Sequence, residues 1–312
     1  MIIIVVLLSF LAPLVVPAPQ PWKALDPEQT LYVYKRCFED HLPSGSTRRA
    51  YIKFWIDCKL EPNDPITHCY VKCALAGLQY YDPEKNTFKA ERIPIQYQAY
   101  KHFFQVKQEE VSKFQNALAT TTPKTNSCVD LYNAYIPIHN KFLNVSRQLY
   151  HGRNETNDII YAARPDIKQK YESFHAYCER RAWKDKKQSE WKQGRNYELS
   201  GSPELKQAID CIFHGLRYMD DTGLRVDEIV RDFNLINKSE LGPKVRQILE
   251  TCSGSEAYDY YSCLLNSDLK EDFKEAFDYH ELRSADYAYL LLQNVYIGPE
   301  KVKEALKKLT NI

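Results

Sequence analysis

Two acidic residues near the C-terminal end of the chain are spaced in a way that suits the binding of a positive charge. Asp278 and Glu281 are three residues apart, so in a helix both carboxylates would lie on one face. A ligand ammonium group needs carboxylates within ion-pair reach, and an aromatic ligand needs aromatic walls. The spacing therefore indicates either a site for an amine or, as for most such pairs, a solvated helix face.

Aromatic residues form a second candidate site in the N-terminal third of the chain. Residues 51–60 read Tyr-Ile-Lys-Phe-Trp-Ile-Asp-Cys-Lys-Leu and contain Trp55, and Tyr70 follows a cysteine at position 69. In helices these rings would recur on shared faces. They could line a long apolar tunnel that carries a few polar groups, or they could be ordinary aromatic residues of a core. Both interpretations stay open on the residues alone.

The sequence lacks the patterns that catalysis commonly uses. It contains no Gly-x-Ser-x-Gly elbow, no His-Glu-x-x-His pair, no P-loop and no dinucleotide-binding fingerprint. Its eight histidines are scattered without the spacing of metal ligands. Cys58 lies next to Asp57, but a leftover cysteine in this apolar segment is typical of a buried, unreactive thiol. We therefore expect no catalytic residue, no metal site and no cofactor.

The elements that position these residues follow a leader segment. Residues 2–16 form an apolar run that is too short and too interrupted by proline to cross a bilayer comfortably, and it ends in small residues. We interpret residues 1–18 as a secretory signal peptide, cleaved near Ala18. Since no later segment approaches 18 uncharged apolar residues, we expect a secreted chain that does not enter a membrane.

Composition favours helices and small ligands. Lys plus Arg number 42 and Asp plus Glu number 41, a balance that argues against a nucleic-acid or polybasic membrane surface. Only 10 glycines and no sustained alternation of apolar and polar residues favour an all-α chain. The 23 tyrosines supply rings that can line a pocket and still offer a hydroxyl.

Nine cysteines indicate a disulfide framework in two related halves. Cys69 and Cys73 are four apart, so their helix could be tied to two neighbours at once, and no second pair at ligand spacing supports zinc. Cys178 precedes Cys211 by 33 residues, much as an earlier pair is separated by 36. An odd total leaves at least one cysteine without a partner in the chain. The pairing we expect is Cys37–Cys73, Cys69–Cys128, Cys178–Cys211 and Cys252–Cys263, with Cys58 free.

A polar stretch separates the two cysteine groups. Three glycosylation sequons begin at Asn144, Asn154 and Asn237, and they suggest exposed positions. The first two lie in the polar stretch from about 144 to 157. We place the domain boundary there, with an N-terminal domain at 19–162 and a C-terminal domain at 163–312.

The early cysteine, the Cys-x-x-x-Cys helix and its later partner resemble insect odorant-binding proteins, which are disulfide-tied helical shells around an apolar pocket. Two such domains in one secreted chain resemble the long-form D-seven salivary proteins of blood-feeding mosquitoes, over essentially the whole mature chain. The supporting stretches are Trp22-Lys-Ala-Leu-Asp-Pro-Glu-Gln-Thr-Leu, Cys69-Tyr-Val-Lys-Cys and Phe277-Asp-Tyr-His-Glu-Leu-Arg-Ser-Ala-Asp-Tyr. The resemblance implies two disulfide-stapled, odorant-binding-protein-like helical domains in tandem.

The resemblance also implies a salivary protein, acting as a monomer, that sequesters host mediators and so counters vasoconstriction, platelet aggregation and inflammation. Its N-terminal domain would bind eicosanoids, namely cysteinyl leukotrienes and thromboxane. Tyr70 stands where family members bond a hydroxyl of thromboxane analogues, and Trp55 matches a ring of the same pocket. Lys168 is the nearest match for a cation that meets the lipid head, with Lys170 as a rival.

For the C-terminal domain the resemblance implies biogenic amines such as serotonin, histamine and the catecholamine noradrenaline. Asp278 and Glu281 match the acidic pair of the family, and His214 and Tyr261 match further contact positions. Arg195 and Tyr197 are weaker matches.

One departure leaves amine binding open. Amine-binding relatives tie the C-terminal tail to the second domain with another disulfide, whereas this chain ends without a cysteine after Cys263. A loose or differently placed tail would follow.

An alternative function is inhibition of a coagulation or contact-pathway factor through the protein surface. The segment Glu179-Arg-Arg-Ala-Trp-Lys-Asp-Lys-Lys is a basic strip that could meet an anionic partner, although a solvated helix face is the simpler interpretation.

Overall fold

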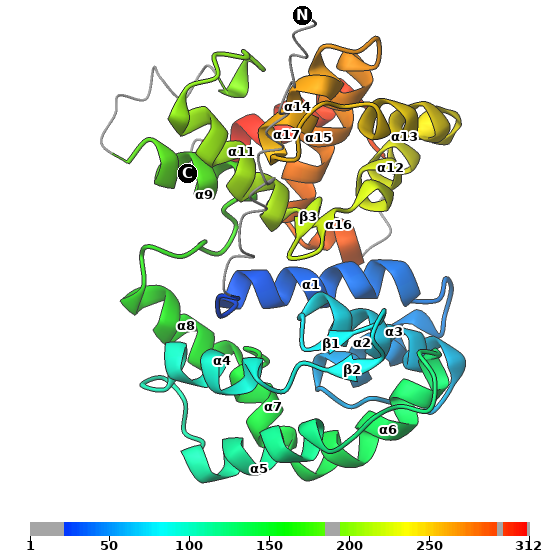
Figure 1. The fold of residues 1–312 in the computed structure, drawn as a ribbon, viewed down its shortest axis with the longest axis vertical. Coiled ribbons are helices and arrows are strands. Elements are labelled where there is room, and N and C mark those ends of the chain that lie inside the picture. The colour runs from blue at the N-terminus through cyan, green and yellow to red at the C-terminus, as the bar shows by residue number, and fades with distance from the viewer. Residues whose placement is uncertain (1–21, 185–193, 292–295, 311–312) are drawn as a thin grey trace, which may run out of the picture.

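The computed structural model describes residues 22–184, 194–291 and 296–310, which form two helical halves stacked end to end (Figure 1). The expected signal peptide at 1–18 and part of the basic strip lie outside these ranges. Apart from two short hairpins and a 3-10 turn, the regular elements in these ranges are α-helices, which confirms the all-α class. In the described ranges, no helix has both the length and the apolar character needed to span a bilayer.

The first half contains eight helices and one hairpin within the described ranges. In chain order they are α1 (Pro27–His41), α2 (Arg48–Ile56), α3 (Pro65–Gly77), β1 (Tyr81–Asp82), β2 (Thr87–Phe88), α4 (Arg92–Tyr100), α5 (Gln108–Ala119), α6 (Cys128–Lys141), α7 (Leu143–Leu149) and α8 (Asn154–Ala163). The expected domain boundary at 162 falls in the last turn of α8. A connecting segment then leads into the second half.

The second half repeats this plan with a longer C-terminal part. Its elements are α9 (Phe174–Ala182), α11 (Pro203–Gly215), β3 (Met219–Asp220), β4 (Gly223–Leu224), α12 (Val226–Leu235), η1 (Ser239–Leu241), α13 (Gly242–Glu250), α14 (Ala257–Leu265), α15 (Lys270–Ala285), α16 (Ala288–Leu291) and α17 (Pro299–Thr310). Each half has its own apolar core.

Helices α3 and α11 show that the two halves are copies of one plan. Each is 13 residues long, begins with proline after a capping residue, and carries a disulfide cysteine at its ninth position. The caps are Asp64, which accepts the backbone N–H of Thr67 at 2.8 Å, and Ser202, which accepts that of Leu205 at 3.2 Å. An antiparallel hairpin follows each helix, pairing Tyr81 with Phe88 and Met219 with Leu224.

Glycine ends both of these helices because another helix passes very close. A Cβ on Gly77 would lie 2.6 Å from a methyl carbon of Val33 on α1. A Cβ on Gly215 would lie 2.4 Å from the ring of Phe174 on α9. Since real Cβ contacts are not this short, a side chain at either position would separate the two helices.

The disulfides are those expected from the cysteine pattern. Cys37–Cys73 ties α1 to α3, and Cys178–Cys211 ties α9 to α11 in the same way. Cys69–Cys128 joins α3 to α6, and Cys252–Cys263 closes a loop onto α14. Cys58 is free and half-buried rather than fully buried. Cross-links of this kind contribute about 2–4 kcal/mol each by constraining the unfolded chain.

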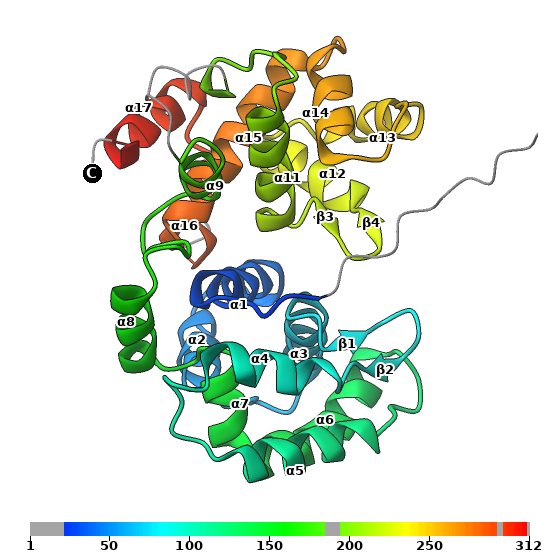
Figure 2. The same cartoon turned by 60° about the vertical axis from the view of Figure 1, so that its left-hand side comes forward.

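Helix α1 lies between the two halves, facing α16 across the junction (Figures 1 and 2). Arg36, which is 1% exposed, pairs with Glu228 of the second half, and Arg231 bonds Glu39 at 2.6 Å. Arg283 bonds the same Glu39 at 2.6 Å. The halves are thus joined by buried ion pairs in addition to the chain connection.

The C-terminal tail is not loose, in contrast to one of our sequence-based expectations. Helix α17 packs along α15, and Val302 and Leu306 on α17 are 1% and 9% exposed. Burial of apolar side chains therefore anchors the helix, although α17 carries no cysteine.

Candidate binding pockets

The N-terminal half contains a cavity of about 400 Å³, here called the N-terminal pocket. Residues of α1, α2, α3 and α6 line it, together with α7 and the first turn of α8. Its apolar lining includes Leu31, Tyr34, Phe38, Trp55, Leu60, Tyr70, Val71, Leu75, Leu78 and Tyr80. Mostly apolar pockets with a few polar groups are typical sites for small ligands.

Trp55 and Tyr70 form one wall of this pocket, where the sequence placed them. Their rings stack face to face with centroids 3.9 Å apart and planes 2° apart. The indole N–H of Trp55 donates to the carbonyl of Glu61 at 3.1 Å. The ring of Phe38 packs against both rings, with its centroid 5.5 Å from that of Trp55 and 5.3 Å from that of Tyr70. Burial raises the pKa of Tyr70 well above its usual value, so its hydroxyl stays protonated and can donate a hydrogen bond.

A cationic group that sequence reasoning missed lines the same pocket. Arg147 and Arg153 lie beside the free thiol of Cys58, and Arg153 donates to the side-chain oxygen of Asn144 at 2.8 Å. The two arginines belong to the stretch that we interpreted as an exposed boundary between domains. In the structure α7 and α8 fill that stretch, and Val145 and Leu149 are buried. The three sequon asparagines are nevertheless exposed, as expected.

Lys168 does not line the N-terminal pocket, so its expected position is corrected. Its side chain is 0% exposed, and its ammonium bonds the carboxylate of Glu28 at 3.0 Å. The hydroxyl of Tyr161 also donates to Glu28, and that of Tyr287 does so at 2.7 Å. Lys168 is therefore held at the junction of the two halves by a buried carboxylate on α1. Its rival Lys170 lies at the surface and pairs with Asp158.

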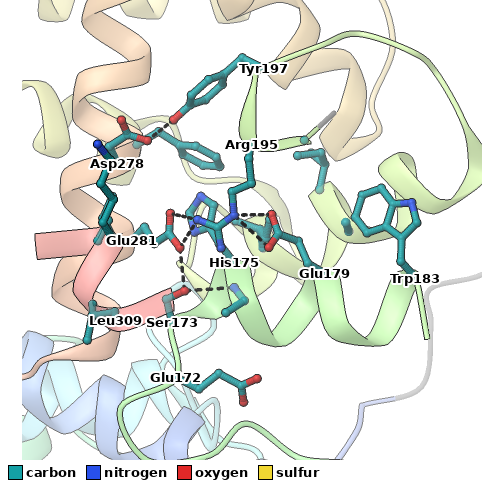
Figure 3. Close-up of a pocket in the computed structure, with 18 of the residues that line it drawn as sticks. Glu172, Ser173, His175, Glu179, Trp183, Arg195, Tyr197, Asp278, Glu281 and Leu309 are labelled. Atoms are coloured by element: carbon teal, nitrogen blue, oxygen red, sulfur yellow. Dashed lines mark hydrogen bonds and ion pairs between the residues drawn. The ribbon is translucent and has the colours of Figure 1, made fainter. Parts of the chain in front are cut away.

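The C-terminal half contains a larger cavity of about 900 Å³, here called the C-terminal pocket (Figure 3). Arg195 spans two of its carboxylates: Nη1 bonds Glu281 at 2.6 Å and 2.7 Å, and Nε bonds Glu179 at 2.9 Å and 3.0 Å. Ser173 donates to Glu281 at 2.8 Å. An internal cation therefore already neutralises much of the negative charge in this pocket.

Asp278 is a carboxylate in this pocket that Arg195 does not bond. It accepts a hydrogen bond from the hydroxyl of Tyr197, as Figure 3 shows. Burial raises the pKa of Asp278 to about 6. At Glu281 the electrostatic effects of His175 and Arg195, together with the hydrogen bonds from Arg195 and Ser173, outweigh burial and lower the pKa. Tyr261 lines the pocket as expected, 5.9 Å from the ring of Phe277.

His214 lies outside the C-terminal pocket, which corrects another expectation. It is exposed on α11 with Nε2 3.7 Å from the carboxylate of Asp210. The residues of α11 that line the pocket recur on one face of the helix, and position 214 lies outside that face; they are Leu205, Ala208, Ile209 and Ile212. The weaker matches Arg195 and Tyr197 do line the pocket.

The histidine that lines the C-terminal pocket is His175, on α9. It is not among the site residues predicted from the sequence. The usable signal was its place two residues after Ser173, which caps α9 and faces Glu281. No group of His, Cys, Asp and Glu within the described ranges is arranged to hold a metal ion.

The two arginines of the basic strip are engaged within the protein. Arg180 pairs with Glu172 at 2.9 Å, and Arg181 donates to the hydroxyl of Tyr177 at 2.8 Å. Residues 185–187 of the strip lie outside the described ranges.

Comparison with known proteins agrees with this arrangement. The chain is 71% identical over 309 residues to long form salivary protein D7L1 of Anopheles stephensi, covering 99% of this chain and 98% of that protein. The crystal structure of the AnSt-D7L1–U46619 complex matches with a TM-score of 0.84 at 71% identity, covering 93% and 98% of the two chains. The AeD7–leukotriene E4 complex matches with a TM-score of 0.79 at 32% identity, covering 88% and 95%.

Residues 161–267 also match the PBP/GOBP family, within the second half of the chain. The chain contains two copies of one disulfide-tied helical plan, each with a pocket. It is 71% identical to a long-form salivary protein along nearly its whole length. It belongs to the family of long-form D7 salivary proteins of mosquitoes.

Proposed function

We propose that this chain is a secreted salivary scavenger that sequesters host eicosanoids, of the cysteinyl leukotriene and thromboxane classes, in its N-terminal pocket. The observation that carries the proposal is the stacked pair of Trp55 and Tyr70 in the wall of a cavity that also exposes Arg147 and Arg153. Solved complexes of relatives with U46619 and with leukotriene E4 support a ligand of this kind. Sequestration would counter vasoconstriction, platelet aggregation and inflammation at the bite.

The chemistry of the pocket suits a long acyl chain with polar groups. The apolar chain would lie against the aromatic wall, where burial contributes about 0.8 kcal/mol per methylene. The protonated hydroxyl of Tyr70 can donate to a ligand hydroxyl, and an arginine can bind a carboxylate. This pairing of a hydroxyl donor with a cation distinguishes the pocket from an ordinary aromatic core.

Calorimetric titration of the refolded protein with U46619 and with leukotriene E4 tests this proposal. We expect one ligand per chain, and we expect Tyr70→Phe to weaken U46619 binding by about 1 kcal/mol, the value of one lost hydrogen bond. Leukotriene binding should change less. Tyr81→Phe is the matched control, because Tyr81 is equally buried, donates to Asn86 and lies outside the pocket lining. An unchanged U46619 affinity in Tyr70→Phe would refute the role of Tyr70, and no binding by the folded protein would refute the function.

A second function, amine binding, is favoured by the carboxylate of Asp278 in the C-terminal pocket, although Lys170, Arg195, Lys303 and Lys307 balance the charge of the lining as a whole. Asp278 keeps a carboxylate that Arg195 does not bond, and Phe277 and Tyr261 supply aromatic walls. We expect Asp278→Asn to abolish binding of serotonin or histamine while U46619 binding is kept. Glu271→Gln, on the same helix but without pocket contact, is the control. Amine binding that survives in Asp278→Asn would overturn the assignment.

A further inference from the structure

His175 is a buried polar residue whose environment leaves its ring nitrogens unsatisfied. It lies on the first turn of α9, is 6% exposed and lines the C-terminal pocket. Its ring packs edge-on against Phe277 with centroids 4.3 Å apart. Figure 3 shows the side chain close to Arg195 and Glu281.

Both ring nitrogens of His175 are buried without a hydrogen-bond partner. The other deeply buried histidines in the described ranges each bond through at least one nitrogen. His280 bonds Tyr32 and Asp232, His151 bonds the carbonyl of Leu25 at 3.1 Å, and His139 bonds that of Cys58 at 2.8 Å. Because buried polar atoms in native proteins are nearly always paired, an imidazole with two open positions beside a cavity points to a ligand group.

The neighbouring charges do not supply the missing partner. Glu281 is engaged by Arg195 and Ser173, and Glu179 is engaged by Arg195. Burial lowers the pKa of His175 to about 4, so the imidazole is neutral near pH 7. A neutral imidazole offers one donor and one acceptor and no charge. Its complement is a group that can both accept and donate, of which a hydroxyl is the simplest.

We propose that His175 is a specificity-determining residue of the C-terminal pocket that binds a hydroxyl group of an aromatic ligand. The aromatic ring lies against Phe277, which His175 also contacts. For an amine the ammonium binds Asp278 and the hydroxyl binds His175, so the pocket prefers hydroxylated aromatic amines over their deoxy counterparts. The amine part rests on the proposed second function, whereas hydroxyl recognition does not.

Two ligand pairs that differ by one hydroxyl test the proposal. Serotonin against tryptamine measures recognition in an amine, and 5-hydroxyindole against indole measures it without an ammonium. By calorimetry or competition we expect the wild-type protein to prefer the hydroxylated member of each pair by roughly three- to tenfold, the range for one hydrogen bond. His175→Phe should remove the preference by weakening only the hydroxylated ligand. His175→Gln, which keeps a donor and an acceptor, should retain part of it.

The controls separate this proposal from amine binding. His214→Phe changes an exposed histidine outside the pocket and should leave every affinity unchanged. If neither amine binds but 5-hydroxyindole is still preferred over indole through His175, the amine function fails and the assignment of His175 stands. If the amines bind without any preference, or if His175→Phe keeps the preference, the assignment of His175 is overturned.

A spectroscopic measurement covers the case in which His175→Phe does not fold. In the wild-type protein, 5-hydroxyindole should shift the NMR signals of the His175 ring more than indole does. Equal shifts from the two compounds, or no binding of any of the four ligands, would overturn the proposal.

Discussion

Replacing Lys168 with methionine should destabilise the protein without weakening ligand binding. Lys168 and Glu28 are 0% and 3% exposed in their side chains, so the change leaves a carboxylate buried without its counter-charge. Such a loss costs about 3–5 kcal/mol. We expect the lower end, about 3 kcal/mol, because the hydroxyls of Tyr161 and Tyr287 continue to donate to Glu28.

Thermal and urea unfolding followed by circular dichroism measure this cost. At roughly 2–4 °C per kcal/mol, a loss of 3 kcal/mol lowers the Tm by about 6–12 °C. The double variant Lys168→Met/Glu28→Gln should regain more than half of the loss, because a neutral amide still accepts from both tyrosines. Lys170→Met is the control: its ion pair with Asp158 is exposed and should contribute less than about 1 kcal/mol.

Titration of the folded Lys168→Met protein with U46619 separates a structural role from a ligand role. The structure predicts an unchanged affinity, since Lys168 does not line the N-terminal pocket. A loss of less than 1 kcal/mol in stability, or a double variant no more stable than the single one, would refute the buried-pair argument. A loss of U46619 affinity at intact stability would return Lys168 to the lipid site.

Three further outcomes follow from the structure. Burial raises the pKa of Asp278 to about 6, and an ammonium group binds only the ionised carboxylate. The affinity for an amine, measured by calorimetry, should therefore fall roughly tenfold between pH 7.5 and pH 5. An affinity that does not change with pH would exclude Asp278 as the group that binds the ammonium. Gly215→Ala should lower the free energy of unfolding by about 1–3 kcal/mol in urea, because the added methyl group meets the ring of Phe174. This clash should outweigh the higher helix propensity of alanine. A stabilised variant would contradict the close approach of α9 and α11. Replacing Cys252 and Cys263 with serine should lower the free energy of unfolding by about 3 kcal/mol, the value for a disulfide that closes a loop of this length, and leave the U46619 affinity unchanged. A loss of U46619 binding would show that the two halves unfold together.

Local signals in the sequence sufficed for the fold. Asp64 before Pro65 and Ser202 before Pro203 are local signals for the starts of α3 and α11, and the spacing of cysteines within two related halves identified all four disulfides. The two hairpins were not predicted, because each strand is only two residues long and shows no alternation. Trp55, Tyr70, Tyr261 and the acidic pair line pockets, at positions that the resemblance to the salivary family had indicated.

The errors concern residues whose roles depend on contacts distant in sequence. The partner of Lys168 is Glu28, 140 residues away, so no local pattern could show that its charge is already paired. His214 was assigned by its distance from a cysteine, but the rotation of α11 about its own axis turns it to solvent. Arg147 and Arg153 were hidden in a polar stretch that forms helices only because Val145 and Leu149 pack against the core of the first half.

Helix α1 explains why the two halves cannot be understood as independent domains. Its residues Leu31, Tyr34 and Phe38 line the N-terminal pocket, whereas Tyr32 and Arg36 contact the second half through His280 and Glu228. A helix that buries both faces is constrained on both, and moving it to admit a ligand would strain ion pairs whose arginines, Arg36 and Arg283, are 1% exposed. The same contacts keep α1 in place when the pocket is empty. We therefore expect the N-terminal pocket to be largely preformed, a condition that favours fast and tight capture because little ordering is left to occur on binding.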